Sequence, residues 1–332
     1  MRSHLGLALV CPGHGSTLQV DRVLPGRYTS RSFEKHEHVQ PPGRPGNQST
    51  HRASPGSITM ASNHNIKRMR EVNNQKQHFV LIHGSVAGAW VWYKVKPRLE
   101  EAGHRVTALD MAASGLNTQK IEEVRTFDQY NEPLMEFMAK LPENEKVVLV
   151  GHSLGGLNLA FAMEKFPEKV SLAVFLTAIL PDTVHQPSYM LEKYSEIGPK
   201  GEEWQDTLFS LHGTPEEPHA CVHMGFEFMK CKPFHLSSAE DLALQMLLNR
   251  PGSMFVESLS KAKKFTDERY GSVPRVYIVC TEDLMMCASF QRWMIEQNGV
   301  KEVMEIPADH VPVFSTPAEL CHSILELARK HA

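Results

Sequence analysis

The chain has 332 residues, of which 42% are hydrophobic and 22% are charged, and its formal net charge at pH 7 is −3. Such a chain can bury a substantial core, and its nearly balanced charge gives no reason to expect nucleic acid or an anionic membrane as a partner. No apolar stretch approaches the length needed to cross a bilayer. The six cysteines lack zinc-ligand spacing, which favours reduced thiols in a reducing compartment, so we expect no disulfide and a cytoplasmic location.

The first 75 residues differ in composition from the rest of the chain. Pro, Gly, Ser, His and Arg dominate them and no hydrophobic period is visible, so we expect a disordered extension. Acidic residues are sparse and Arg and Ser frequent, as in organelle transit peptides, which leaves a chloroplast address open. A second interpretation, which we favour, is that translation starts at Met60 and that residues 1–59 are an artefact of the gene model.

A regular alternation of strand-like and helix-like segments begins at residue 76. We predict strands at residues 78–82, 105–109, 147–150 and 172–177. We predict helices at residues 92–101, 127–140 and 157–165. Alternation with short connections indicates a mostly parallel sheet covered by helices on both faces.

The alternation breaks after Asp182 and resumes near residue 265. The resumed part predicts strands at residues 275–280 and 303–306 and helices at residues 290–298 and 317–331. We therefore assign an α/β core to residues 76–181 and 265–332. Residues 182–264 form an insertion, called the cap below, which we expect at the carboxyl ends of the strands, where open parallel sheets bind ligands.

A G-x-S-x-G motif occupies residues 151–155, between a predicted strand and a predicted helix. In that context the turn is so tight that it needs its glycines, and it pushes the hydroxyl of Ser153 out of the sheet as a nucleophile. The same turn places the serine at a helix N-terminus, which favours a developing negative charge. A Gly/Ser loop that only packs a helix on a sheet is the alternative, and the flanking strand and helix favour catalysis.

A serine nucleophile needs a histidine base, and the histidine needs an acid to orient it. In this arrangement the acid and then the histidine follow the serine along the chain. Asp283 comes just after the strand at residues 275–280, and His310 comes just after the strand at residues 303–306. Both should therefore project from the sheet edge that carries Ser153.

Other residues compete for these roles. Glu282 is the second candidate for the acid, while Asp309 is expected to bond the backbone of its own loop. His152 precedes the nucleophile and is expected to be structural.

An oxyanion hole requires two backbone N–H groups. Leu154, which follows the nucleophile, supplies one, and the loop after the first strand supplies the other. Ser85 is our candidate in that loop, and Gly84, which we also expect in the substrate pocket, allows close approach of the backbone to the substrate oxygen.

Several stretches, taken together, resemble the plant methylesterase family of α/β-hydrolases, which has hydroxynitrile lyases as relatives. They are residues 79–84, 92–94, 103–110, 112–115, 151–156, 270–273 and 308–310. The resemblance implies an α/β-hydrolase fold with a cap and hydrolysis of methyl esters such as methyl salicylate, methyl jasmonate or methyl indole-3-acetate, without a metal or cofactor. It maps the catalytic triad onto Ser153, Asp283 and His310.

The resemblance also implies a substrate pocket and an assembly. The matching pocket positions are Ile179, Tyr194, Trp204, Phe209, Val222, Met224 and Met254. The expected partner is a small-molecule methyl ester, with no nucleic acid or membrane, and a homodimer is in keeping with the family.

The chain departs from the family pattern at residues 85–88, 284–288 and 311–313, which leaves the acyl group open. An alkaloid methyl ester is an alternative substrate. Hydroxynitrile lyase activity is a second alternative, although one lyase branch carries Thr and Lys where this chain has Gly84 and Val311. Non-catalytic binding of a small ligand is the third.

Overall fold

The computed structural model describes residues 76–214 and 218–331. The expected disordered extension and the alternative start at Met60 concern residues outside this part of the chain. Within the described ranges, no helix has both the length and the apolar character needed to span a membrane.

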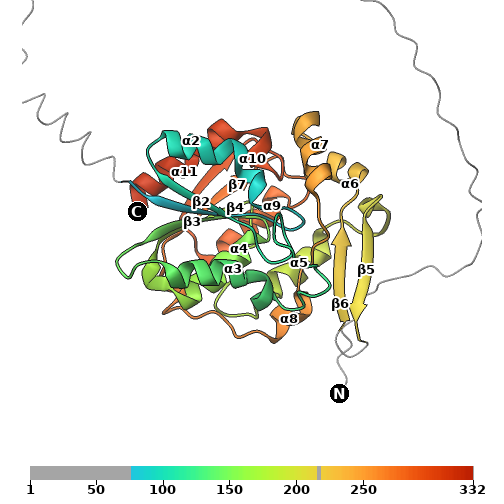
Figure 1. The fold of residues 1–332 in the computed structure, drawn as a ribbon, viewed down its shortest axis with the longest axis horizontal. Helices are drawn as coiled ribbons and strands as arrows, with labels where there is room; N and C mark the ends of the chain where they lie inside the picture. The colour runs from blue at the N-terminus through green and yellow to red at the C-terminus, as the bar shows by residue number, and fades with distance from the viewer. Residues whose placement is uncertain (1–75, 215–217, 332) are drawn as a thin grey trace, which may run out of the picture. The chain divides into compact units, whose positions relative to one another are not determined.

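A six-stranded sheet forms the centre of the described part, with the strand order β2-β1-β3-β4-β7-β8 (Figure 1). The strands are β1 (His78–Ile82), β2 (Arg105–Leu109), β3 (Val147–His152), β4 (Val170–Leu176), β7 (Arg275–Cys280) and β8 (Glu302–Ile306). Every neighbouring pair in this sheet is parallel. All six residues of β3 are buried, as expected for a central strand covered on both faces.

Helices cover both faces of the sheet, so the predicted α/β-hydrolase architecture is confirmed. One face is covered by α2 (Val95–Glu101) and α11 (Pro317–His331), and the other by α3 (Phe127–Lys140), α4 (Gly155–Lys165) and α9 (Ala288–Asn298). Short helices η1 (Ala89–Lys94), η2 (Pro167–Lys169), η4 (Tyr270–Ser272) and α10 (Pro312–Ser315) lie in the connections.

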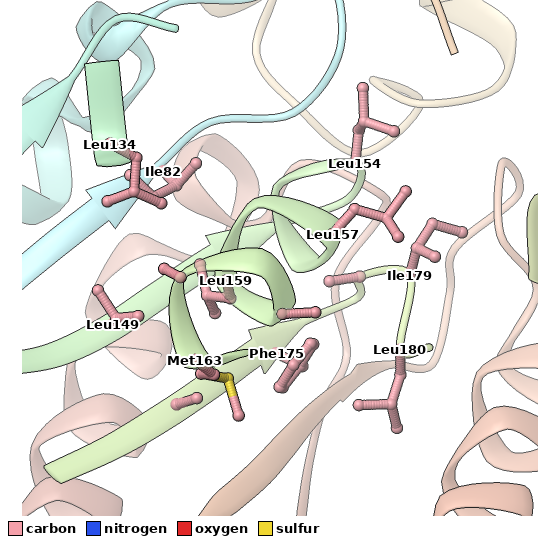
Figure 2. Close-up of a cluster of buried hydrophobic side chains, with 14 of the residues drawn as sticks. Ile82, Leu134, Leu149, Leu154, Leu157, Leu159, Met163, Phe175, Ile179 and Leu180 are labelled. Atoms are coloured by element: carbon pink, nitrogen blue, oxygen red, sulfur yellow. The ribbon is translucent and has the colours of Figure 1, made fainter. Parts of the chain in front are cut away.

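Two hydrophobic clusters match the two faces, because alternate residues of each strand point to opposite sides. Val148 and Val150 join the cluster under α2 and α11, whereas Leu149 joins the cluster under α3 and α4. Figure 2 shows this second cluster, in which Leu159 and Met163 of α4 pack near Phe175 of β4.

Local signals explain where several elements begin. A capping box starts α3, since Thr126 Oγ1 accepts from the Gln129 amide at 3.2 Å while Gln129 Oε1 accepts from the Thr126 amide at 3.2 Å. The predicted bounds of α3 and α11 agree with the structure. Helix α4 begins two residues earlier than predicted, at Gly155, because the chain turns into the helix directly after the nucleophile motif.

The cap lies between β4 and β7 in the sequence. It contains α5 (Tyr189–Ile197), η3 (Gly201–Trp204), β5 (Leu208–Gly213), β6 (Pro218–His223), α6 (Phe226–Cys231), α7 (Ala239–Leu248) and α8 (Val256–Lys261). Strands β5 and β6 pair antiparallel as a separate sheet, drawn in yellow in Figure 1 outside the main sheet. The sequence pattern did not predict these cap elements.

Candidate active site

Ser153 occupies a strained turn directly after β3. Its φ of 54° lies in the left-handed region that non-glycine residues rarely adopt. The turn cannot relax, because Ser153 N donates to the Leu176 carbonyl and its own carbonyl accepts from the Ile179 amide at 3.0 Å. A larger residue would clash at Gly151 of the motif, because a Cβ there would lie 2.7 Å from the carbonyl oxygen of Gly155. The local sequence therefore projects the serine hydroxyl from the sheet edge.

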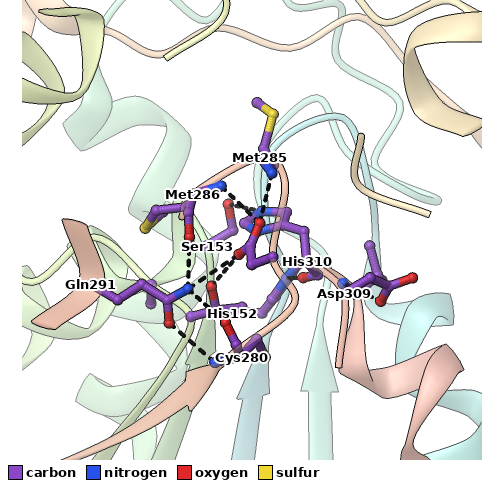
Figure 3. Close-up of polar contacts among 12 residues, drawn as sticks. His152, Ser153, Cys280, Met285, Met286, Gln291, Asp309 and His310 are labelled. Atoms are coloured by element: carbon purple, nitrogen blue, oxygen red, sulfur yellow. Dashed lines mark hydrogen bonds and ion pairs between the residues drawn. The ribbon is translucent and has the colours of Figure 1, made fainter. Parts of the chain in front are cut away.

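Two loops bring a histidine and a carboxylate to this hydroxyl (Figure 3). His310 Nε2 lies 3.0 Å from Ser153 Oγ, and His310 Nδ1 lies 2.7 Å from Asp283 Oδ2. His310 and Asp283 are buried, with 6% and 3% exposure, while Ser153 is half-buried. With Nδ1–H donating to the carboxylate, Nε2 is left to accept the serine proton.

Several donors fix the carboxylate of Asp283. The amides of Met285 and Met286 each donate to Oδ1 at 2.7 Å, and Thr177 Oγ1 donates to Oδ2 at 2.6 Å. Gln291 Nε2 also lies 3.4 Å from Oδ2. Sequence analysis missed both Thr177 and Gln291, because no local motif links them to an aspartate in another loop.

Glu282, the competing acid, lies elsewhere. Its side chain is exposed and accepts from Thr281 Oγ1 at 3.3 Å, so it contacts its chain neighbour and not His310. The structure thus gives His310 one acidic partner, Asp283.

Two further histidines support the loops around the site. His152 Nε2 donates to the carbonyl of His310 at 2.6 Å, and burial lowers the pKa of His152 to about 3, so its ring is neutral. His83 Nδ1 donates to the Gly84 carbonyl at 2.7 Å, while its Nε2 accepts from the Met111 amide at 3.1 Å. Burial lowers the pKa of His83 as well. Both rings are structural groups that fix backbone near the nucleophile.

The two amides predicted for an oxyanion hole flank the nucleophile turn. Among the described residues, neither the Ser85 amide nor the Leu154 amide donates to a protein acceptor. Gly84 lies against the nucleophile, since a Cβ there would be 3.0 Å from Ser153 Cβ. The loop after β1 therefore passes directly beside the nucleophile.

A cavity that is partly open to solvent lies above Ser153 and His310. Its lining is mostly apolar and comes from both the core and the cap. Three predicted pocket residues line it, namely Gly84, Met224 and Met254. The lining also includes Ser85, Val86, Ala87, Val91, Met229, Pro233, Phe234, Gln245, Met285 and Val311. Val311 could have been expected from the sequence, because it follows His310 directly. Met229 and Phe234 could not, because they belong to short cap segments without a clear hydrophobic period.

The remaining five predicted pocket residues do not line the cavity. Ile179 is packed in the core, and the Tyr194 hydroxyl donates to the Met285 carbonyl at 2.7 Å. Trp204 stacks on the ring of Phe228 at 4.8 Å. Phe209 and Val222 are paired across the β5–β6 hairpin, and Phe209 is 51% exposed. Trp204 therefore packs within the cap, and Phe209 and Val222 belong to the cap hairpin.

Within residues 76–214 and 218–331, no group of three or more His, Cys, Asp or Glu side chains is arranged to hold a metal ion.

Comparisons with known proteins agree with this architecture. A family model described as alpha/beta hydrolase fold matches residues 77–317. The chain is 56% identical over 256 residues to salicylic acid-binding protein 2 of Nicotiana tabacum, covering 77% of this chain and 98% of that protein. It is 54% identical over 258 residues to methylesterase 1 of Arabidopsis thaliana, covering 77% of this chain and 97% of that protein.

A third relative is known both by sequence and by structure. Polyneuridine aldehyde esterase of Rauvolfia serpentina is 50% identical over 255 residues, covering 76% of this chain and 96% of that protein. The crystal structure of polyneuridine aldehyde esterase superposes with a TM-score of 0.74 at 49% identity and covers 76% of this chain and all of that chain.

Proposed function

This chain belongs to the plant methylesterases of the α/β-hydrolase fold family and is a carboxylic ester hydrolase, and from that membership we propose that Ser153, His310 and Asp283 hydrolyse methyl esters of small, largely apolar carboxylic acids. The observation that carries the proposal is the continuous contact from Ser153 Oγ through both ring nitrogens of His310 to Asp283 Oδ2.

The reaction is a two-step acyl transfer. His310 Nε2 takes the proton of Ser153 as the hydroxyl oxygen attacks the ester carbonyl, and the amides of Ser85 and Leu154 stabilise the resulting oxyanion. The C–O bond to the leaving group breaks, and methanol departs with the proton from His310. A water molecule, deprotonated by the same histidine, then attacks the acyl-enzyme and releases the acid and the free serine.

The cavity lining supports an aromatic or alkyl acyl group. Methionine and phenylalanine side chains such as Met224, Met254 and Phe234 offer apolar contact, and thioethers adapt to different shapes. Acyl groups of the salicylate, jasmonate or indole-3-acetate type fit this chemistry, and the name of the tobacco relative refers to salicylic acid.

A second candidate substrate is an alkaloid methyl ester. It is favoured by the 50% identity to polyneuridine aldehyde esterase over nearly the whole of that protein. Hydroxynitrile lyase activity has no comparable support, because Gly84 and Val311 supply neither a hydroxyl nor a cation at the cavity. Pure ligand binding would leave the hydrogen-bonded arrangement of Ser153, His310 and Asp283 without a use.

The test is methanol release from a panel of methyl esters: salicylate, jasmonate, indole-3-acetate and an alkaloid ester. The full chain is compared with Ser153→Ala, and circular dichroism verifies that both are folded. We expect turnover of at least one ester and its loss by about 10⁴-fold or more in the variant. Turnover that survives in Ser153→Ala, or its absence on every ester with folded protein, would overturn the proposal.

A further inference from the structure

Asp309 is a fully buried carboxylate that lies next to His310 in the chain but does not contact Ser153. In Figure 3 its side chain points away from Ser153. Its Oδ1 accepts from the Val311 amide at 3.0 Å and from Ser315 Oγ at 2.8 Å. This oxygen therefore ties the loop that carries His310 to both ends of α10, since Val311 precedes the helix and Ser315 ends it.

The other oxygen of Asp309 binds the cap. Oδ2 accepts from the Leu236 amide at 3.1 Å and from Ser237 Oγ at 2.8 Å. Leu236 and Ser237 lie in the turn between α6 and α7, a few residues after Pro233 and Phe234, which line the cavity. One carboxylate thus joins the cavity wall to the histidine loop.

An aromatic contact also joins the cap to α10, the helix that follows His310. Phe234 of the cap packs on Phe314 of α10 with 5.6 Å between ring centroids, and both side chains are buried. A buried carboxyl group in such surroundings is stable only while its donors stay in place, because removing them leaves buried oxygens without partners. The cap turn and the histidine loop are therefore expected to move together or not at all.

We propose that Asp309 is a positioning residue that couples the cap turn at residues 233–237 to His310, so that the histidine is held within reach of Ser153 only while this part of the cap is seated. The inference rests on the proposed function, in which His310 is the general base. A shift of about 1 Å in a catalytic group can cost on the order of 10²-fold in rate, so a small change in the loop has a large kinetic effect.

Asp309→Asn is the decisive substitution. Each carboxylate oxygen faces two donors, so the amide NH₂ of an asparagine would meet N–H or O–H donors in either orientation. Ser237→Ala removes one contact on the cap side alone, and Ser315→Ala removes one contact on the loop side alone. These two milder variants test the proposal even if Asp309→Asn folds poorly.

Asp241 provides a matched control. It is also a buried aspartate that joins the cap to the core, since it lies in α7 and accepts from Tyr93 Oη at 2.8 Å and Lys94 Nζ at 2.6 Å. Among the contacts described for it, none is with the loop that carries His310. Asp241→Asn therefore weakens the attachment of the cap without removing a hydrogen bond of the histidine loop.

The experiment measures kcat and KM of the full chain on the methyl ester it hydrolyses fastest, with the folded fraction of each variant from circular dichroism. We expect Asp309→Asn to lower kcat by about 10- to 100-fold per folded molecule, while Asp241→Asn keeps kcat within about twofold. Ser237→Ala and Ser315→Ala should each lower kcat by about threefold, and neither should have a further effect in the Asp309→Asn background, because both act through the same carboxylate. The loss should appear in kcat, whereas weaker packing of the cavity wall alone would raise KM.

Three results would overturn the coupling: kcat of Asp309→Asn within about twofold of the parent, an equal loss of kcat in Asp241→Asn, or multiplicative effects of Ser237→Ala and Asp309→Asn. Each is distinct from failure of the proposed function, which would appear as turnover that persists in Ser153→Ala.

Discussion

The edge of the sheet and the cap wall, which face each other across the cavity, are built differently. At the sheet edge, polar side chains such as Asp283 and His152 are buried and each is held by short hydrogen bonds to named partners. The cap contributes mainly methionine, proline and phenylalanine to the cavity. Polar contacts such as those of Asp309 and Asp241 attach the cap to the core.

This difference separates two demands on an ester hydrolase. Proton transfer and oxyanion stabilisation require groups fixed to within a fraction of an ångström, which a parallel sheet and its tight turns can supply. Recognition of an apolar acyl group depends on contact area, which adaptable side chains can supply without directional bonds. Changes at the sheet edge should therefore alter rate strongly, and changes in the cap wall should alter affinity modestly.

Asp283→Asn, at the sheet edge, should lower kcat more than any other substitution described below. The amides of Met285 and Met286 would retain the asparagine carbonyl, so its NH₂ would face His310 Nδ1. The histidine would then carry its proton on Nε2 and could not accept one from Ser153. We expect kcat to fall by about 10³- to 10⁴-fold in a methanol-release assay.

Glu282→Gln is the control for this prediction, because Glu282 is the exposed neighbour that contacts Thr281. It should change kcat by about twofold or less, as is usual for an exposed position away from the reacting atoms. A loss in Glu282→Gln as large as that in Asp283→Asn would show that the acid had been assigned incorrectly.

The same division explains what could be predicted from the sequence. Ser153, Asp283 and His310 each follow a strand of the parallel sheet, namely β3, β7 and β8, so topology alone brings them to one edge. Thr177 and Gln291 escaped prediction because their contacts with Asp283 depend on how the loop after β4 and helix α9 pack against the loop of Asp283.

The cap was harder to predict because its helices are short and its hairpin exposes apolar residues. Phe209 is an aromatic residue that family resemblance puts in the pocket, yet its strand leaves it 51% exposed. Phe234, which does line the cavity, lies in a turn that has no hydrophobic period. Where backbone geometry does not fix the direction of a side chain, sequence pattern does not reveal it.

His152→Gln also changes the sheet edge and should have a smaller effect, which we expect in the pH dependence of the free energy of unfolding. Burial lowers the pKa of His152 to about 3, so below its ordinary value of 6.5 the unfolded chain binds a proton that the folded chain does not. The contribution of His152 to the free energy of unfolding is therefore fully present above pH 6.5 and is lost as the pH falls toward 3. Between pH 7.5 and 5.5 this single group should lower the free energy of unfolding by about 1.4 kcal/mol, a contribution that glutamine removes.

Urea unfolding of both proteins at the two pH values checks this prediction. Burial also lowers the pKa of His83 and His219, so the variant should keep part of the pH dependence. His322→Gln, at a histidine whose side chain is 81% exposed, should match the parent. The same dependence on pH in His152→Gln and the parent would contradict a neutral, buried His152.

Met254→Ala tests the cap wall and should have the smallest effect. Its half-buried side chain lines the cavity without a polar role, so truncating it reduces the apolar area available to the acyl group but leaves the sheet edge unchanged. Because a buried methylene is worth about 0.8 kcal/mol, we expect KM for a bulky methyl ester to rise about fourfold for each methylene group that no longer packs against the acyl group. The rise should be less for a methyl ester with a small acyl group, and kcat should stay nearly constant.

Leu247→Ala, at an 82% exposed cap position outside the cavity lining, is the control and should leave both constants unchanged. If Met254→Ala instead lowered kcat with KM constant, the cap wall would take part in the chemical step and the division between the two regions would not hold.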